Sequence, residues 1–514
     1  MMMRMKDDSG KVTRPAEVPV RGARSSPAPL CGSRLKTFGK AILCVAMILS
    51  VAWLTLCVWL SRELPPVFTA AELTQFVPSW PRGFLWGTAI AAHQVEGGQH
   101  NDWTRFEEQP GAITSGERSG RADDMWNRFP QDVVLMKALR ANAIRLSIEW
   151  SRVEPVKGKW DEPAWTRYIE WMHLLSQNGI TPMVTLLHYT LPVWMADRGG
   201  LTALDFPERF VHFAGEAAAR LGPDVHVWCT INEPNYHVHH AYIAGNYPPQ
   251  QRSAVEAAKA FAGLLRAHAL ASQVIRKHDP AARIGVAISL TDYQPASRWS
   301  LPDWVATTRQ ADEDNWAFYD SIKSGRIRFN LSSAASSNTV ASNSYLNAVN
   351  RPADSSASYD EPLPGLLGSA DWFGANYYDR NLVRFAPFSR GFLQIREGPG
   401  PKGDLGWEIY PEGLLSLLQS VWTRYKLPLY ITENGLPDAA GTKRAAFIRA
   451  HAYAVSRAIA EGVPVKGYFF WSFVDNFEWV DGFAPKFGLY RVNYTTLDRQ
   501  LAPGAEEFIK LAPQ

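Results

Sequence analysis

The chain has 514 residues, of which 46% are hydrophobic and 20% are charged. This is the balance of a globular protein with a buried core, and it excludes a wholly disordered chain and a disulfide-stapled miniprotein. The formal net charge of +3 hints at an acidic partner, so the position of the basic residues along the chain decides what that charge means.

The positive charge is concentrated in residues 1–40, which contain nine Lys or Arg and three acidic residues, a net charge of +6. Residues 41–514 contain 44 basic and 47 acidic residues, a net charge of −3. A nucleic-acid-binding domain carries a basic surface. The mildly acidic body therefore predicts no nucleic-acid partner, and we interpret residues 1–40 as a basic cytoplasmic tail.

Residues 41–60 have no charge, and 18 of these 20 residues are apolar. Twenty such residues in a helix cross the hydrocarbon core of a bilayer. A buried core helix is disfavoured because the segment has no polar face. A cleaved signal peptide is the stronger alternative, but residues 61–64 contain no small-x-small cleavage site. We expect an uncleaved transmembrane signal anchor in a single-pass membrane protein. By the positive-inside rule everything after Arg62 is then exported, to a periplasmic, extracellular or lumenal space.

Residues 61–79 contain three prolines and are interpreted as a linker. From residue 80 onward, short apolar segments alternate with amphipathic ones. The predicted strands are 84–88, 143–148, 181–187, 227–231, 283–288, 372–376, 429–432 and 465–470. The clearest predicted helices are 132–139, 207–221, 254–276, 413–425 and 443–460. Eight strands alternating with helices predict an α/β fold, with residues 80–514 forming one (β/α)₈ TIM barrel behind the transmembrane helix.

One segment departs from the alternation. Residues 330–369 are rich in Ser, Asn and Ala and are predicted to be a long loop between the fifth and sixth strands. A loop of this length is either a disordered insertion or an ordered lid.

The reacting groups of such a barrel lie at the C-terminal ends of its strands. Glu233 and Glu433 stand out there, because each follows an apolar strand, where a carboxylate is costly to bury without a role. Two facing carboxyls suit a glycosidase: the protonated one donates to the leaving oxygen, and the ionised one attacks the anomeric carbon. Arg145 and Tyr378 are placed to hold one of them ionised. Position alone leaves open that both merely cap loops.

Seven segments carry a resemblance to a known family. In chain order they are FLWGTAIAAHQVEGG, RLSIEWSRVEP, TLLHYTLPVW, CTINEPN, FGANYY, YITENG and FFWSFVDNFEW. With them the chain resembles glycoside hydrolase family 1, the β-glucosidase and β-galactosidase family, from about Phe84 to Tyr490. The resemblance implies a retaining double displacement with neither metal nor cofactor.

The resemblance also implies roles for individual residues. Glu233 is the general acid/base, and Glu433 is the nucleophile that forms a covalent glycosyl-enzyme. Arg145 and Tyr378 orient Glu433 and keep it ionised, and Asn232 binds the sugar 2-hydroxyl. The remaining sugar-binding set that it implies is Gln94, His188, Asn376, Trp471, Glu478 and Trp479.

Three further positions qualify the resemblance. Glu478 predicts an unphosphorylated sugar, because a carboxylate repels a phosphate dianion. Tyr189 stands where most family members have Trp, which leaves the preferred glycone open. The cluster His237-Val238-His239-His240 has no carboxylate or Cys partner at metal-ligand spacing, so we interpret it as a surface or loop cluster and predict no metal site.

We expect an exo-acting, β-glucosidase-like hydrolase that is attached to the membrane through residues 41–60 and acts on a β-linked sugar or glycolipid. One alternative is a membrane-tethered transglycosidase that moves a β-linked sugar onto a glycolipid or oligosaccharide acceptor, as some plant members of the family do. Another is a non-catalytic sugar-binding protein, which is disfavoured because both glutamates are present. The sequence determines neither the aglycone nor the oligomeric state.

Overall fold

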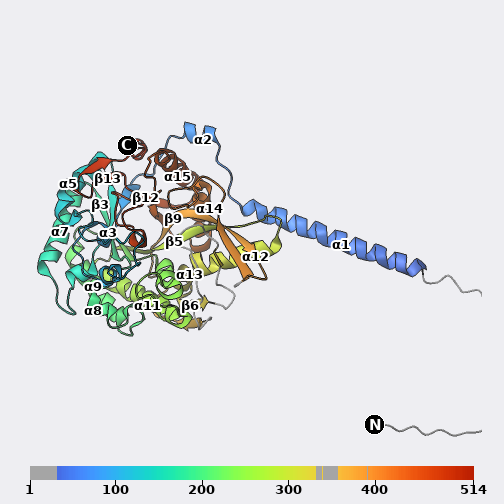
Figure 1. Cartoon of the computed structure of the whole chain (residues 1–514), viewed down its shortest axis with the longest axis horizontal. Helices are drawn as coiled ribbons and strands as arrows, with labels where there is room; N and C mark the ends of the chain where they lie inside the picture. The colour runs from blue at the N-terminus through green and yellow to red at the C-terminus, as the bar shows by residue number, and fades with distance from the viewer. Residues whose placement is uncertain (1–31, 332–337, 340–356, 390–391, 514) are drawn as a thin grey trace, which may run out of the picture. The chain divides into compact units, whose positions relative to one another are not determined.

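The computed structural model describes residues 32–331, 338–339, 357–389 and 392–513. The chain divides into two compact units, Met1–Leu56 and Cys57–Gln514. The second unit contains the predicted barrel, and Figure 1 labels its helices and strands, which are numbered in chain order.

Eight parallel strands of the described chain close into a barrel. They are β1 (Leu85–Ala89), β2 (Ala143–Ser147), β3 (Thr181–Leu187), β4 (Val227–Asn232), β5 (Arg283–Pro295), β9 (Trp372–Phe385), β11 (Leu429–Asn434) and β12 (Val465–Trp471). Each strand pairs with the next along the chain, and closure comes from β12 pairing with β1. The eight predicted strands and the TIM-barrel class are therefore confirmed.

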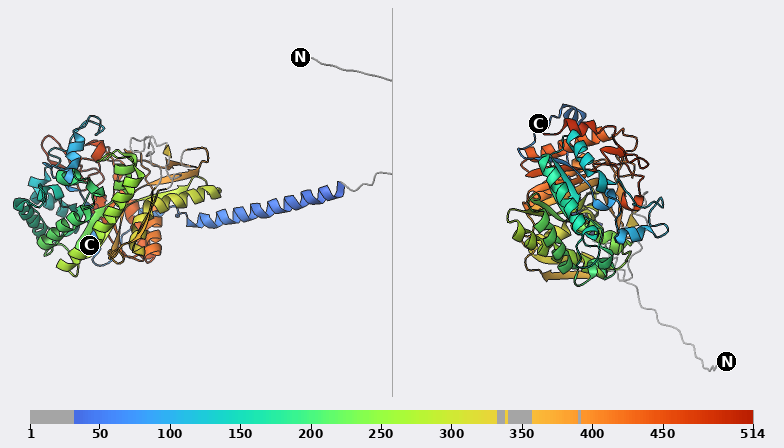
Figure 2. Two further views of the ribbon diagram at one scale, coloured as in Figure 1. Left: turned by 90° about the horizontal axis from the view of Figure 1, so that it is seen from below. Right: turned by 90° about the vertical axis from the view of Figure 1, so that its left-hand side faces the viewer.

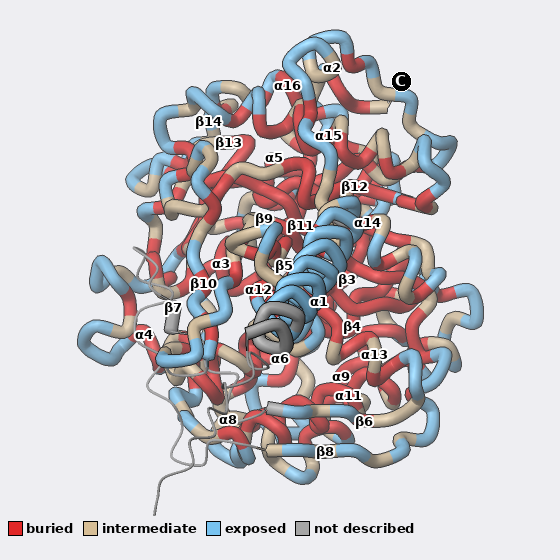
Figure 3. Tube along the Cα trace, turned by 90° about the vertical axis from the view of Figure 1, so that its right-hand side faces the viewer, coloured by how far each residue is buried: buried red, intermediate tan, exposed pale blue. Residues whose placement is uncertain are grey.

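The barrel strands are buried on both faces, as parallel strands covered by helices must be. Every residue of β2 and β4 is buried, and Figure 3 shows the strands as a buried interior. The helices lie outside the closed sheet (Figures 1 and 2). Each connection between successive barrel strands contains one of the following helices: α5 (Met125–Ala138), α7 (Glu162–Gln177), α9 (Phe206–Leu221), α11 (Ala254–His278), α13 (Ala317–Ser324), α14 (Pro411–Tyr425) and α15 (Arg444–Ala460). The five predicted helices are among them.

The rim beside β5 and β9 was not predicted. Both strands run well past their expected ends and stay paired up to Pro295 and Val383. The strand β10 (Leu393–Glu397) then pairs antiparallel with β9, and α12 (Leu301–Ala311) packs beside them around a small apolar cluster. Polar residues interrupt the apolar pattern after residues 288 and 376, which is why the prediction ended the strands there.

The predicted loop 330–369 is partly replaced by strands. Its ends belong to an antiparallel hairpin in which β6 (Arg326–Leu331) pairs with β8 (Ala357–Pro362). The two-residue strand β7 (Asn338–Thr339) pairs with β10. Residues 332–337 and 340–356 of the predicted loop lie outside the described residues.

The first unit contributes most of one long helix, α1 (Gly32–Leu60). Its 23 residues from Phe38 to Leu60 include an 18-residue window with a mean hydropathy of 2.6. The stretch is long and apolar enough to cross a membrane, as a signal sequence also is. The hydroxyls of Ser50 and Thr55 donate to backbone carbonyls four residues earlier, so neither polar side chain interrupts the apolar surface.

The predicted linker is folded in its second half. Thr69 caps the helix α2 (Ala70–Gln75) by accepting a hydrogen bond from a backbone N–H. The buried rings of Phe68 and Phe76 meet the ring of Tyr453 on α15 edge-on, with centroids 4.9 and 5.5 Å away. Edge-to-face pairs of this kind add to the apolar area that is buried. This segment is therefore part of the packed body of the second unit.

The packing of this segment predicts that substitutions of two neighbouring residues change the free energy of unfolding by different amounts. Phe68 is 8% exposed and Val67 is 80% exposed. We expect Phe68→Ala to lower the free energy of unfolding by about 3 kcal/mol, because it empties a packed site. The control Val67→Ala should stay within about 0.5 kcal/mol of the wild type. Chemical denaturation of the full chain in detergent measures both values, and equal losses would contradict the packing.

Candidate active site

Glu233 and Glu433 lie at the C-terminal ends of β4 and β11, and both are buried. Glu233 has a backbone φ of 45°, in the left-handed region, and is the residue before the short helix α10 (Pro234–Val238). A non-glycine residue in this region is strained, and such residues cluster at functional sites. The sharp turn ends the strand and places the Glu233 carboxyl in the same cavity as that of Glu433.

Glu433 is held by a cation and a hydroxyl. Arg145, at the centre of β2, forms a short ion pair through Nη1 with Glu433 Oε1, and both side chains are buried. The Tyr378 hydroxyl donates to Glu433 Oε2 at 2.8 Å. Both contacts stabilise the ionised carboxylate over the protonated acid.

Glu233 has hydrogen-bond donors but no cation in direct contact among the described residues. The Asn376 amide donates to Glu233 Oε1 at 2.8 Å, and the hydroxyl of Tyr189 makes a short hydrogen bond to Oε2. Tyr189, the residue that departs from the family pattern, also packs edge-on against Trp479 with ring centroids 4.9 Å apart. Tyr189 therefore links the Glu233 carboxyl to the Trp479 ring.

These surroundings act differently on the pKa values of the two carboxyls. Burial raises the pKa of Glu233 to about 7, and the negative charge of Glu433 acts in the same direction, against the hydrogen bonds from Tyr189 and Asn376. Burial also raises the pKa of Glu433, but Arg145 and then Tyr378 oppose it. Because only Glu433 is in direct contact with a guanidinium, it is the carboxyl that keeps its charge, while Glu233 holds a proton near neutral pH.

Asn232 is locked by three partners. Its Oδ1 accepts from Arg145 Nη2 at 2.6 Å and from Asn376 Nδ2 at 3.1 Å, and its Nδ2 lies 3.0 Å from His188 Nε2. Burial, aided by the charge of Arg145, holds the pKa of His188 well below its usual value. The neutral ring accepts at Nε2 and so carries its proton on Nδ1, which has no hydrogen-bond partner in the described structure. That N–H is available to a ligand.

Gln94 and Glu478 form a second polar group. Gln94 Nε2 donates to Glu478 Oε2 at 3.2 Å and to the Phe477 carbonyl at 2.9 Å, while Gln94 Oε1 has no partner among the described residues. The Trp471 indole donates to Glu478. Burial, together with the charge of Glu433, raises the pKa of Glu478 to about 8. An unpaired buried amide oxygen beside a carboxyl can accept a hydrogen bond from a ligand hydroxyl.

One cavity of about 1140 Å³ joins these groups. Eight of the predicted site residues line it: His188, Asn232, Glu233, Tyr378, Glu433, Trp471, Glu478 and Trp479. Arg145 and Asn376 stand behind the carboxyls, and Gln94 stands behind Glu478, each joined to them by the hydrogen bonds described above. The structure thus brings all of the predicted site residues together.

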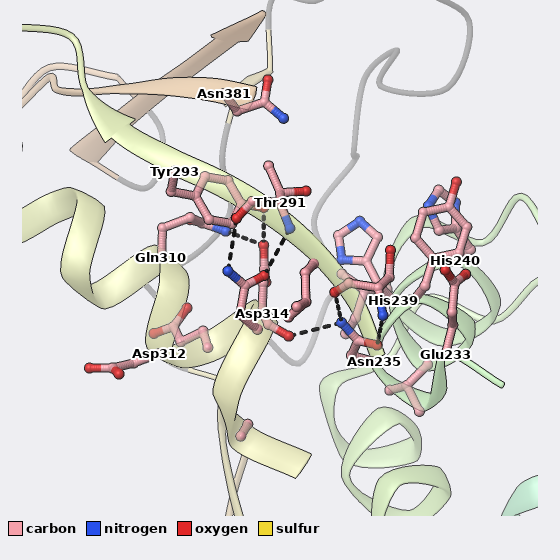
Figure 4. A pocket seen from close by; sticks show the side chains of 18 of the residues that line it. Glu233, Asn235, His239, His240, Thr291, Tyr293, Gln310, Asp312, Asp314 and Asn381 are labelled. Atoms are coloured by element: carbon pink, nitrogen blue, oxygen red, sulfur yellow. Dashed lines mark hydrogen bonds between the residues drawn. The ribbon is translucent and has the colours of Figure 1, made fainter. Parts of the chain in front are cut away.

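The cavity also has a second wall that the sequence did not indicate. It is formed by α10 and the π-helix η3 (His239–Ala244) on one side and by α12, the π-helix η4 (Asp312–Trp316) and the extended strands β5 and β9 on the other (Figure 4). Asn235 joins the two sides by donating from Nδ2 to the backbone carbonyls of Ser289 and Asp314. Only the position of Asn235 directly after the Asn-Glu-Pro motif hinted at this wall.

The histidine cluster is not on a surface loop, so that interpretation was wrong. His237 and His240 are buried on α10 and η3, and His239 and His240 line the cavity. The strand-to-helix turn at Glu233 continues into these helices and carries the cluster inward. Burial lowers the pKa of His237 and of His240 to about 3. Within the described residues, no three His, Cys, Asp or Glu side chains are grouped so that they could hold a metal ion.

Comparison with known proteins agrees with this geometry. The family described as "Glycosyl hydrolase family 1" matches residues 77–510. The chain belongs to glycosyl hydrolase family 1. The match leaves α1 outside the family domain and covers the whole barrel.

Three relatives of this family 1 enzyme illustrate the similarity. It is 32% identical to Beta-glucosidase A of Thermotoga maritima over 441 residues, 82% of this chain and 95% of the relative. The solved β-glycosidase from Pyrococcus horikoshii is 33% identical with a TM-score of 0.73, over 85% of this chain and 95% of that one. The β-glucosidase from Thermotoga maritima in complex with castanospermine is 29% identical with a TM-score of 0.74, over 85% and 100% of the two chains. This chain is therefore a glycoside hydrolase with retaining β-glucosidase homologues.

Proposed function

We propose that this family 1 enzyme is a membrane-attached, exo-acting β-glycosidase for unphosphorylated sugars, with Glu433 as nucleophile and Glu233 as general acid/base. The observation that carries the assignment is the unequal pairing of the two carboxyls. Arg145 and Tyr378 contact Glu433, whereas Glu233 receives only neutral donors and its pKa is raised to about 7.

In the first step, Glu433 attacks the anomeric carbon while Glu233 gives its proton to the glycosidic oxygen, so the aglycone leaves as an alcohol. This forms a glycosyl ester on Glu433 and leaves Glu233 ionised. In the second step, Glu233 removes a proton from water, the water oxygen attacks the same carbon, and the ester bond to Glu433 breaks. Two inversions give net retention, and both carboxyls return to their starting states.

The non-reducing sugar is proposed to bind between the carboxyls and the Gln94–Glu478 pair. The free Nδ1–H of His188 and the free Oε1 of Gln94 offer one donor and one acceptor to its hydroxyls. The Asn232 amide, already fixed by Arg145, is positioned for the 2-hydroxyl. Glu478 interacts electrostatically with both Glu233 and Glu433. A phosphorylated sugar is disfavoured because its dianion would meet the charge kept on Glu433 and would oppose ionisation of the other two carboxyls.

The alternative of sugar transfer gains no support from the relatives named above, which are described as β-glucosidases and a β-glycosidase. Water is therefore the proposed acceptor. The substrate is proposed to be a β-glycoside of the kind that β-glucosidases cleave.

Rescue by azide tests the two assignments against each other. We expect Glu433→Ala and Glu233→Ala each to lower kcat on an activated aryl β-glucoside by about 10³-fold or more, because each removes one reacting group. Azide should rescue both variants with opposite products, the α-glycosyl azide from Glu433→Ala and the β-glycosyl azide from Glu233→Ala. NMR of the products measures the anomer, and the same anomer from both variants would contradict the assignment.

The hydrogen bond from Tyr189 predicts a shift in the pH profile. The reaction needs protonated Glu233, so kcat/KM should fall as the pH rises through the Glu233 pKa of about 7. Tyr189→Phe removes a donor that stabilises the ionised carboxylate, which raises this pKa and moves the basic limb upward by about one pH unit.

A matched control is Tyr242→Phe, which removes the hydroxyl of a buried tyrosine that does not line the cavity. Its pH profile should match that of the wild type. A downward shift of the basic limb in Tyr189→Phe, or equal shifts in both variants, would count against the role given to Tyr189.

We further propose that α1 is an uncleaved signal anchor with the catalytic domain on the exported side. The support is the 23-residue apolar stretch, the +6 tail before it and the start of the family match only at residue 77. The full chain should then stay in membranes after an alkaline wash, and external protease should digest the catalytic domain in intact cells or spheroplasts. A soluble product whose N-terminus lies near residues 62–80 would instead indicate a cleaved signal peptide.

A further inference from the structure

The second wall of the cavity carries three carboxylates that the proposed hydrolysis does not use. Asp314 lies on η4, Asp379 on β9 and Glu397 on β10, and all three line the cavity. Tyr293 links two of them: its hydroxyl donates to Asp314 Oδ2 at 2.6 Å, and it also interacts electrostatically with Asp379, which in turn acts on Glu397. Asn381 is the β-sheet partner of both Tyr293 and Glu397. The carboxylates therefore form one group, which we call the acidic wall.

Within the described part of the chain, the acidic wall has no cation in direct contact with it. Among the described residues, no Lys, Arg or His nitrogen lies within 4.0 Å of the carboxylate oxygens of Asp314, Asp379 or Glu397. Lys402 acts on Glu397 only as a longer-range charge, and His239, near Asp314, is neutral because burial lowers its pKa. The other acids around this part of the cavity are paired, as in Asp312–Arg424, Glu313–Arg309 and Asp360–Arg326.

Unused hydrogen-bond acceptors accompany the charge. Gln310 and Asn381 are each 7% exposed and line the cavity. In the described structure, Gln310 Oε1 and Asn381 Oδ1 have no hydrogen-bond partner. Glu397 Oε2 also has none. Buried polar atoms are normally paired. Figure 4 shows Gln310, Tyr293, Thr291 and Asp314 gathered at one end of the pocket, with Asn381 above them and Glu233 at the right of the view.

The raised pKa values of two carboxyls of the acidic wall agree with the lack of a cation in contact with them in the described structure. Burial raises the pKa of Asp379 to about 6. Burial, together with the charge of Asp379, raises the pKa of Glu397 to about 8. A cation placed between them would relieve both effects, because an opposite charge within a few ångströms favours the ionised form.

A metal ion is a poor occupant, because no cluster of three or more ligating side chains occurs in the described part of the chain. A protonated amine fits better, because it does not need three ligands around one point. It can donate to one or two acceptors, and its charge is attracted by carboxylates and by the face of an aromatic ring such as Tyr293.

We propose that the acidic wall is a subsite for a cationic aglycone, one that carries a protonated amine. This rests on the proposed function, since the aglycone must leave the sugar bound between Glu233 and Glu433 and extend along the same cavity. The amine would donate hydrogen bonds to one or two of Gln310, Asn381 and Glu397 and pair with the carboxylates of the wall.

Binding of a matched trio of thioglucosides tests the proposal without needing turnover. The probes are the 4-(2-aminoethyl)phenyl, 4-(2-hydroxyethyl)phenyl and 4-propylphenyl 1-thio-β-D-glucosides, which have the same length but end in an ammonium, a neutral donor and a methyl group. With the full chain in detergent at pH 7, tryptophan fluorescence titration should give a Kd at least about tenfold lower for the amine than for either neutral probe, the size expected for one charge-assisted contact.

Two substitutions and one control locate the effect. Asp314→Asn and Glu397→Gln should each reduce the preference for the amine by about three- to tenfold while leaving the Kd of the propyl probe unchanged. Asp360→Asn, at the same cavity but paired with Arg326, should keep the wild-type preference. Equal affinities for the three probes in the wild type, tighter binding of the hydroxyl probe, or an equal loss in Asp360→Asn would each overturn the proposal.

The corresponding O-glucosides separate this inference from the proposed function. If the wild type hydrolyses all three without preference for the amine, only the cationic subsite is wrong. If it binds the amine probe selectively but hydrolyses none of the O-glucosides, the subsite stands and the proposed hydrolysis fails.

Discussion

The buried ion pair between Arg145 and Glu433 is the interaction on which the site depends. Arg145 is 1% exposed, and a buried guanidinium is costly unless its donors are paired. Its remaining donors go to Thr185 on β3, to Asn232 on β4 and to the Thr432 carbonyl on β11. One side chain from β2 thus satisfies groups on both sides of the barrel. These partners meet only when the sheet closes, so the closed barrel and the charged site require each other.

From this pair follows the difference between the two glutamates. Both are buried at the same end of the barrel, where two carboxylates cannot both be ionised cheaply. The guanidinium holds the charge on Glu433, and that charge in turn raises the pKa of Glu233. Tyr189 and Asn376 limit how far it rises. The same residue type therefore takes two protonation states through its neighbours alone, which is the difference that the proposed roles of nucleophile and acid require.

The rim of the barrel is built by different means from its interior. The inner groups come from the ends of barrel strands, whereas the acidic wall comes from strand extensions, a π-helix and a hairpin beyond the barrel. Because these parts do not hold the barrel together, their side chains are freer to suit an aglycone. The shared cavity then joins the carboxyls at the end of the barrel to a second acidic group on the rim.

The sequence by itself determined the eight strands, because short apolar runs bounded by turn residues alternate with amphipathic helices, and the barrel follows from that alternation. It also determined the glutamates and their polar neighbours, because each lies in a local motif at a strand end. Only the tertiary structure decided that Tyr189 bonds to Glu233, that the histidines are buried and that residues 68–76 pack on α15. Each of these depends on contacts between residues far apart in the chain, which leave no local pattern in the sequence. The extensions of β5 and β9 were missed for a related reason, because their polar residues show no apolar periodicity.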